Sequence, residues 1–270
     1  ATNIIRGKKY SLITPISMDH QDYLGNSLSK IAFEKFSIFN NKSINFINYQ
    51  KPTVKRFAKD FINKKKMYAQ FAGVDWKIRN QLYIDQDHKI NLKYLSLKGY
   101  HQFDNAGLAI AAVKSILKKQ FDSNLVENAL PKIRWAGRLQ KIESGKLTKV
   151  IHKYDSIFLD GFHNTDGVKV FINNLKGKNN FLICSFLINK NYKSILKLLE
   201  PYFKKIFVTP MEEENSIQVV NVNKTNKINT SSGLLKSIDD LNRVATSNST
   251  IYFGGSLYFI GEVLKFNKKK

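Results

Sequence analysis

Apolar and polar positions change their period several times along this chain of 270 residues. Short apolar runs between turn residues predict β-strands, and apolar residues three or four positions apart predict amphipathic helices. In the first half this pattern predicts, in chain order, a strand at 10–18, a helix at 27–39, a strand at 43–49, a helix at 51–65, short strands between 66 and 96, a helix at 104–119 and a helix or turn at 125–131.

From about residue 132 the pattern becomes regular, because strands and helices alternate. Such alternation predicts an α/β fold with a mostly parallel, doubly wound sheet. The Asn-rich stretch 221–233 is predicted to be a solvated loop, and the length allows two domains. We expect strands at 154–160, 180–187, 204–209 and 249–253, helices at 166–175, 191–200 and 234–244, and a terminal segment at 256–266.

The charge of the chain introduces an alternative function. There are 44 Lys and Arg against 21 Asp and Glu, a formal net charge of +23. This makes a basic, non-enzymatic nucleic-acid-binding protein an alternative hypothesis. However, the lysines are spread along the whole chain, and only 64–66 and 268–270 are dense runs. We therefore expect no nucleic-acid partner, and note that a basic surface also suits anionic small molecules.

The longest apolar run, 181–188, has the length of a strand and falls short of the roughly 18 residues that a membrane helix needs. The single cysteine, Cys184, lies in this run and is expected to be a buried structural thiol. The first residues also lack the apolar core of a signal peptide. These features predict a cytoplasmic protein without a membrane partner.

The stretch at 157–168, IFLDGFHNTDGV, is the first candidate for chemistry. Its apolar run ends on Asp160, and His163 and Asn164 follow before a new helical pattern begins. Open α/β sheets bind ligands outside the carboxyl ends of their strands, so these side chains suit a ligand site. The alternative is an ordinary turn, since Asp, Gly and Asn are common turn residues.

Lys35 is a second candidate, because it interrupts the apolar stripe of the helix expected at 27–39. Ser27 is the expected N-cap of this helix. A lysine on the stripe either extends to the surface or faces a site, and the spacing alone does not separate the two. The stripe consists of Leu28, Ile31, Ala32, Lys35 and Phe39.

The common nucleotide-binding loops are absent from the sequence. A Walker A loop needs Gly, four residues, then Gly-Lys and Ser or Thr. The nearest match, Gly145-Lys146, is followed by Leu147, and Gln140 stands where the first glycine would be. No Gly-x-Gly-x-x-Gly pattern follows a predicted strand either.

Six separated segments together resemble one family. They occur in the family's order and spacing and span nearly the whole chain. On these segments the chain resembles folylpolyglutamate synthase and the bifunctional dihydrofolate synthase/folylpolyglutamate synthase, within the Mur-ligase superfamily. The segments are ATNII at 1–5, ITPISMDHQDYLGNSLSKIAFEKFSIF at 13–39, LKGYHQFDNAGLAIAA at 97–112, WAGRLQ at 135–140, LDGFHNTDG at 159–167 and GGSLYFIGEVL at 254–264.

The resemblance implies two domains. Residues 1–130 would be the rear part of a Mur-ligase central ATPase domain, and 131–270 a C-terminal, doubly wound Rossmann-like domain. Members of the family carry a Gly-rich P-loop and a metal-binding glutamate ahead of the segment that resembles ATNII. Neither has a counterpart here, so the chain as given is expected to be an inactive part of a ligase.

The resemblance also implies an ATP-dependent amide ligase of folate biosynthesis and one-carbon metabolism. ATP would phosphorylate the carboxylate of dihydropteroate or of a tetrahydrofolate (poly)glutamate, and the amine of L-glutamate would attack the acyl phosphate. Mg²⁺ would bridge phosphate oxygens. A monomer is expected, and either acid or both remain open as substrates.

Site residues follow from the same resemblance. His20 resembles the family's magnesium ligand. Lys35 resembles the lysine that the family carbamylates with CO₂, which suits a desolvated lysine that reacts as the free amine. Asn105 resembles the residue that reads the adenine edge, although from position alone it would equally suit an N-cap or early-turn residue of the helix at 104–119.

The remaining site residues lie on both sides of the expected domain boundary. His101 and Gln102 belong to the motif of Asn105 and are expected to shape the nucleotide site. Arg138 resembles the arginine that reaches the terminal phosphate, for which a guanidinium fork is suited. Asp160 resembles the aspartate at the ribose, and His163 the histidine near the phosphates. The resemblance therefore implies a catalytic site that depends on domain closure, with Lys35, Arg138 and His163 in catalytic roles.

Four positions, in three places of the sequence, depart from the family pattern. Phe162 stands where alanine is usual, Ala136 where proline is usual, and Phe36-Ser37 where Ala-Gly is usual. The first is expected to place bulk beside the nucleotide contacts, and the last beside Lys35. Such changes make a degenerate remnant an alternative. A related Mur-type ligase that acts on a different acid is a further alternative within the superfamily.

Overall fold

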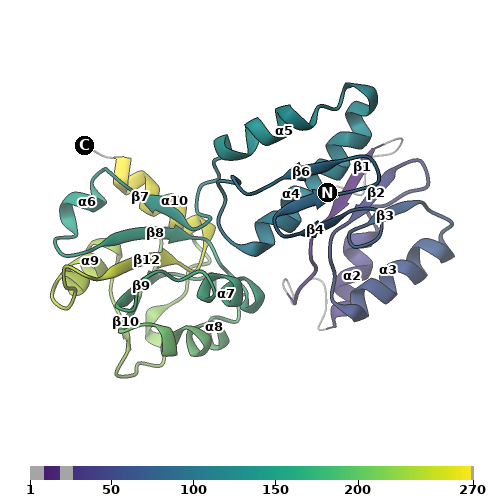
Figure 1. Cartoon of the computed structure of the whole chain (residues 1–270). Helices are drawn as coiled ribbons and strands as arrows, with labels where there is room; N and C mark the ends of the chain where they lie inside the picture. Colours follow the sequence, from purple (N-terminus) through teal and green to yellow (C-terminus); the bar gives the residue numbers. More distant parts are fainter. Residues whose placement is uncertain (1–8, 19–26, 269–270) are drawn as a thin grey trace. The chain divides into compact units, whose positions relative to one another are not determined.

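The computed structural model describes residues 9–18 and 27–268 of the chain (Figure 1). The chain divides into two compact units, Ala1–Arg134 and Trp135–Lys270, which are called unit 1 and unit 2 below. Each unit has its own β-sheet and hydrophobic core. The division follows Arg134, whereas the sequence analysis placed it after residue 130.

Unit 1 is built on a parallel sheet of three strands, β1 (Tyr10–Ile13), β2 (Ile44–Ile47) and β3 (Ala69–Phe71), in that order. Helices α2 (Leu28–Phe36) and α3 (Pro52–Lys64) pack against each other (Figure 1). Their buried residues form one core cluster with Ile13 and Ile47 from the sheet. Pro52 starts α3 as predicted, where its missing N–H costs no helical hydrogen bond.

A second core cluster of unit 1 joins the sheet to helix α4 (Tyr100–Leu117) and to an antiparallel meander. Helix α4 begins four residues earlier than predicted, after Gly99, whose φ of 105° suits glycine. The other elements of this part are β4 (Lys77–Arg79), β5 (Leu82–Ile84), β6 (Lys89–Asn91), η2 (Lys118–Gln120), α5 (Ser123–Ala129) and η3 (Leu130–Lys132).

Unit 2 contains a six-stranded sheet in the order β11-β10-β9-β12-β8-β7. All neighbouring strands are parallel except β7, which pairs antiparallel with β8 at one edge. The prediction of a loop at 221–233 is wrong in part, because β11 lies inside it and pairs with β10. The strands are β7 (Gln140–Ile142), β8 (Ser156–Asp160), β9 (Asn180–Cys184), β10 (Lys205–Val208), β11 (Ile228–Thr230) and β12 (Thr250–Gly254).

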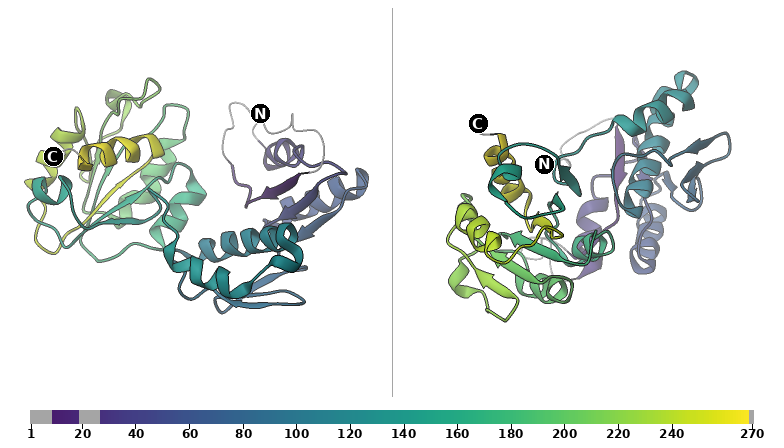
Figure 2. Two further views of the ribbon diagram at one scale, coloured as in Figure 1. Left: turned by 90° about the horizontal axis from the view of Figure 1, so that it is seen from above. Right: turned by 60° about the vertical axis from the view of Figure 1, so that its left-hand side comes forward.

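Helices cover both faces of this sheet, so unit 2 has three layers (Figure 2). Alternate residues of β9 point to opposite faces: Phe181 and Ile183 belong to one core cluster, and Leu182 and Cys184 to the other. Cys184 is the buried thiol that was predicted. The helical segments are α6 (Leu147–Val150), α7 (Thr165–Ile172), α8 (Tyr192–Leu199), η4 (Glu200–Tyr202), η5 (Val219–Asn221), α9 (Leu234–Asn242) and α10 (Leu257–Lys268).

The strand order places two loops side by side at the carboxyl edge of the unit 2 sheet. Strand β12 lies between β8 and β9, and its last residue, Gly254, is in register with Asp160 on one side and Cys184 on the other. The loop after β8 therefore lies next to the loop after β12. None of the described helices combines the length and the apolar character that a membrane crossing requires.

Candidate functional site

Strand β8 ends at Asp160, and helix α7 starts at Thr165, close to where the sequence predicted both. Asn164 is the N-cap of α7, because its side-chain oxygen accepts the Gly167 N–H at 2.8 Å. Asn164 therefore has a structural role at the start of this helix. Asp160 and His163 remain as the candidate chemical groups of this strand–helix connection.

The Asp160 carboxylate is fixed by backbone donors. It accepts the Leu139 N–H at 2.9 Å and a further hydrogen bond from the Phe162 N–H. Burial raises the pKa of Asp160 to about 6, although these hydrogen bonds and the nearby charges of Arg138 and His163 work in the opposite direction. Near neutral pH the carboxylate is thus ionised, oriented and only partly solvated.

Arg138 reaches this place because the segment before β7 is bound to the end of β8. The Gly161 N–H donates to the Gly137 carbonyl at 2.9 Å, next to the bond between Leu139 and Asp160. A Cβ added at Gly161 would lie 3.2 Å from Nη1 of Arg138 and 2.7 Å from Cγ of Leu257. Glycine at 161 therefore leaves room for the close approach of both side chains.

His163 completes the group in unit 2. Its Nδ1 lies 3.1 Å from the Gly161 carbonyl, an interaction in which an Nδ1–H donates. The structure thus brings together Arg138, Asp160 and His163, which span 25 positions of the sequence. We call these three residues the carboxyl-edge cluster. Their roles at a nucleotide stay predictions.

The predicted residues of unit 1 lie in the first turns of α4. Gln102 is buried, His101 and Asn105 are half-buried, and the Asn105 side-chain amide donates to Gln102 Oε1 at 3.2 Å. Asn105 is not the N-cap of this helix, because Gly99 takes that position, whereas the alternative of an early-turn residue agrees with its place in α4. Both amide side chains are instead held together on the helix.

Lys35 lies half-buried in the last turn of α2, and Ser27 is the N-cap as predicted. The helix ends at Phe36, so Phe39 lies beyond it, and Phe36 joins Ile31 and Ala32 in the core. The apolar stripe therefore passes beside Lys35 rather than through it. His20, the predicted magnesium ligand, lies outside the described residues.

The residues that depart from the family pattern lie at buried and at exposed positions. Phe162 is 3% exposed and belongs to a core cluster, so its ring points away from solvent and does not add the bulk that we expected beside the site. Phe36 is also buried, with its ring centre 5.5 Å from that of Phe39. Ser37 is the C-cap residue of α2, and Ala136 is exposed.

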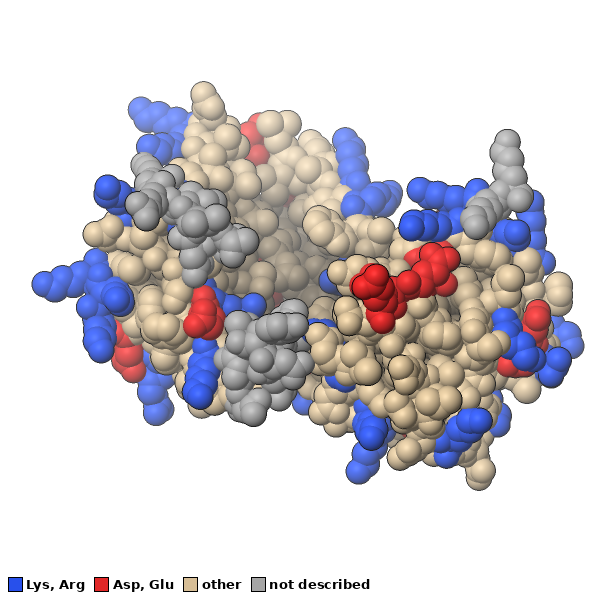
Figure 3. Space-filling model, turned by 180° about the vertical axis from the view of Figure 1, so that it is seen from behind, with Lys and Arg blue, Asp and Glu red and all other residues tan. Residues whose placement is uncertain are grey.

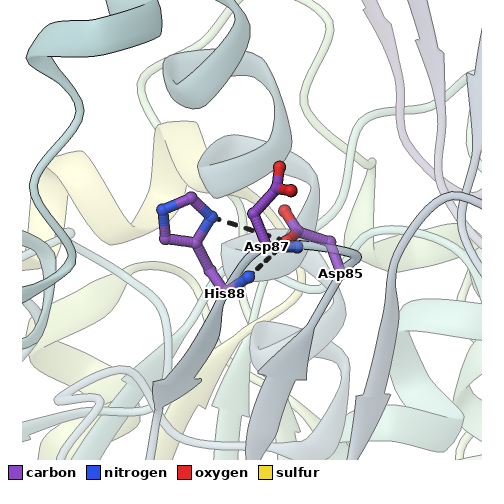
Figure 4. A group of neighbouring side chains, drawn as sticks. All are labelled: Asp85, Asp87 and His88. Atoms are coloured by element: carbon purple, nitrogen blue, oxygen red, sulfur yellow. Dashed lines mark hydrogen bonds and ion pairs between the residues drawn. The ribbon is translucent and has the colours of Figure 1, made fainter.

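A cluster that the sequence analysis missed is formed by Asp85, Asp87 and His88 after β5 (Figure 4). His88 Nδ1 lies 3.5 Å from Asp85 Oδ1, and Lys114 Nζ lies 2.9 Å from Asp85 Oδ2 and 2.6 Å from Asp87 Oδ2. The Lys114 ammonium thus already supplies the positive charge that two carboxylates attract. The cluster fits an ion pair between α4 and the meander, and it does not fit a metal centre.

The sequence and the fold of this chain are similar to those of known proteins. No protein-family model matches the chain. A dihydrofolate synthase/folylpolyglutamate synthase of Mycobacterium tuberculosis is 28% identical over 235 residues, which cover 77% of this chain and 46% of the relative. The solved folylpolyglutamate synthase of the same organism, complexed with ADP, matches with a TM-score of 0.82 at 22% identity, over 97% of this chain and 64% of that one. This chain is thus similar to folylpolyglutamate and dihydrofolate synthases.

A third comparison agrees with these two. The bifunctional folylpolyglutamate synthase/dihydrofolate synthase of Yersinia pestis, complexed with AMPPNP and Mn ion, matches with a TM-score of 0.76 at 16% identity, over 95% of this chain and 60% of that one. The predicted resemblance to these synthases and the predicted α/β fold class are confirmed. The chain spans between about half and two thirds of the length of these synthases.

Proposed function

We propose that this chain forms part of an ATP-dependent ligase that joins L-glutamate to dihydropteroate or to a folate that already carries glutamate. The observation that carries the proposal is the carboxyl-edge cluster, which gathers a carboxylate, a guanidinium and an imidazole where parallel sheets bind ligands. The homology to the synthases supplies the reaction. We further propose a cytoplasmic monomer.

The chemistry of the cluster suits a nucleotide. An ionised Asp160 accepts hydrogen bonds from ribose hydroxyls, and its two backbone donors leave its remaining lone pairs for a ligand. The Arg138 guanidinium suits phosphate oxygens, on which it offsets negative charge. His163 is the nearby imidazole, and a ring N–H of it would donate to a phosphate oxygen.

The proposed cofactors are ATP and Mg²⁺. ATP supplies the phosphoryl group that activates the carboxylate, and Mg²⁺ offsets the charge of the phosphates. The proposed magnesium ligand is His20. We propose that Lys35 acts as a carbamate, and that Asn105, with His101 and Gln102, contacts the adenine.

The 270 residues contain no P-loop sequence, so we propose that they do not ligate glutamate on their own. The test uses two proteins: the product of the whole reading frame that encodes this chain, and the 270-residue chain. Each is incubated with ATP, Mg²⁺, radioactive L-glutamate and either dihydropteroate or tetrahydrofolate. We expect the whole product to incorporate glutamate and to release ADP stoichiometrically. We expect the 270-residue chain to do neither. If the whole product incorporates glutamate with neither acid, the proposed function is wrong.

A nucleic-acid-binding protein is the second candidate function, which the net charge of +23 favours. On the face drawn in Figure 3, Lys and Arg side chains form several groups with uncharged surface between them. Binding to a duplex would need several cations in reach of one run of phosphates. A filter-binding titration at two salt concentrations, without ATP, separates this alternative from a ligase.

A further inference from the structure

Phe162 lies between Asp160 and His163 in the sequence, but its ring is buried in the hydrophobic core of unit 2. The side chain is 3% exposed, and its ring centre lies 4.6 Å from that of Phe171 and 6.5 Å from that of Phe186. The residue therefore ties the loop after β8 to helix α7 and to the segment after β9. A loop whose middle residue is buried in this way has few alternative conformations.

Gly254, at the end of β12, makes the space for this ring. A Cβ added at Gly254 would lie 2.7 Å from Cζ of Phe162, closer still to Cε1, and 3.1 Å from the Asp160 carbonyl oxygen. Such approaches do not occur between real atoms unless something moves. Because Gly254 is in register with Asp160, the ring sits beside the residue that carries the candidate carboxylate.

The backbone of Phe162 connects this packing to the site. Its N–H donates to the Asp160 carboxylate, and its carbonyl carbon is bonded to His163. The other donor to the carboxylate, Leu139 N–H, comes from a different segment. A shift of the Phe162 ring would move one of the two donors and redirect the His163 side chain.

We propose that Phe162 is a positioning residue, whose ring, seated against Gly254, holds its own N–H on the Asp160 carboxylate and sets the direction of His163. This inference rests on the proposed function, because it concerns nucleotide binding at the carboxyl-edge cluster. A methyl group at 162 would leave the loop without this anchor, and a methyl group at 254 would displace the ring.

The test compares Phe162→Ala and Gly254→Ala with Phe203→Leu. Phe203 is the control, because its buried ring belongs to the same core cluster and packs against Phe171 and Tyr252. The first readout is hydrogen exchange of the residue-162 amide in the 270-residue chain above pH 7. We expect at least tenfold faster exchange in Phe162→Ala and in Gly254→Ala, and no such change in Phe203→Leu.

The second readout is the KM for ATP in the product of the whole reading frame. We expect Phe162→Ala to raise it at least tenfold, with kcat and the KM for folate changed less than threefold, and Phe162→Leu to restore most of the affinity. Equal behaviour of Phe162→Ala and Phe203→Leu in both readouts would overturn the inference. An inactive wild-type product would overturn the proposed function instead, while amide exchange would still decide whether Phe162 holds the loop. If Phe162→Ala does not fold, Gly254→Ala takes its place in both readouts, with the same expected changes and with Phe203→Leu as the control.

Discussion

The carboxylate of Asp160 accepts the backbone N–H of Leu139 at 2.9 Å, across 21 positions of sequence. This bond fastens the segment before β7 to the end of β8, and the bond from Gly161 N–H to the Gly137 carbonyl reinforces it. Arg138 lies between these two attachments in the sequence. The proximity of a guanidinium to a half-buried carboxylate is thus a consequence of backbone hydrogen bonding.

From the raised pKa of Asp160 we predict how the free energy of unfolding depends on pH. Its pKa is about 6 in the folded chain against 3.8 for an ordinary aspartate, mainly because of burial. The folded state therefore holds the proton more tightly than the unfolded state, and the free energy of unfolding falls as the pH rises from about 4 to about 6. We expect Asp160→Asn to remove roughly 1–3 kcal/mol of this pH dependence, measured by urea unfolding at pH 4, 5, 6 and 7.

Asp155 is the matched control for this experiment, because it is exposed and immediately precedes the same strand. Asp155→Asn should leave the pH dependence between 4 and 6 as in the wild type. Parallel unfolding profiles for Asp160→Asn and the wild type would show that Asp160 titrates as an ordinary carboxyl.

The nucleotide role that we propose for Asp160 has a kinetic consequence in the product of the whole reading frame. Asp160→Ala removes the acceptor proposed for the ribose hydroxyls, so we expect the KM for ATP to rise roughly tenfold or more, as the loss of about 1.4 kcal/mol of binding implies. The KM for the folate substrate should change much less. Initial rates at varied ATP and varied folate measure both constants, and an unchanged KM for ATP would place Asp160 outside the nucleotide site.

Lys35 is expected to be essential as a carbamate. In the whole product, Lys35→Ala should lose most of the ligase activity, and short-chain carboxylates such as acetate should restore part of it, because they replace the lost anion. Lys30→Ala is the control, since Lys30 is exposed on the same helix. Full activity of Lys35→Ala without added carboxylate would remove the carbamate role.

The ion pair of Lys114 makes a prediction about unit 1. Although burial acts in the other direction, hydrogen bonds from Lys114 and Tyr83 hold the pKa of Asp85 below its usual value. Lys114→Met leaves Asp85, with a side chain only 6% exposed, without its cationic partner. We expect a loss of about 1–2 kcal/mol in the free energy of unfolding, against a negligible change for the exposed Lys119→Met.

Millimolar Mg²⁺ or Ca²⁺ offers a further check on the same cluster. Because the Lys114 ammonium already pairs with both carboxylates, neither ion should bind at this cluster and raise the thermal unfolding midpoint of the wild type. A rise that disappears in Asp85→Asn would show that the cluster binds metal after all.

Much of unit 2 was predictable from the sequence, because its pattern is local. The apolar run that ends on Asp160 and the capping residue Asn164 define the end of β8 and the start of α7 within a few residues. Strand β11 was not predictable in this way, because its three residues, Ile228–Thr230, lie in a polar stretch and gain their hydrogen bonds only from β10. Pairing partners distant in sequence leave no local period.

The candidate site shows the same limit. Arg138, Asp160 and His163 were predicted by resemblance, but the bonds of Leu139 and Gly161 that bring them together involve backbone atoms, which any residue except proline supplies. The direction of the Phe162 ring depends on Gly254, 92 positions away. Likewise, Lys114 and Asp85 come together only because α4 packs against the meander.

The most direct test of a nucleotide site at the carboxyl-edge cluster is a crystal structure of the whole reading-frame product with ADP. We expect the ribose hydroxyls of ADP within hydrogen-bond distance of the Asp160 carboxylate, and Arg138 and His163 on the side of the phosphates. ADP bound elsewhere, with Asp160 contacting only protein, would contradict the proposed role of this cluster.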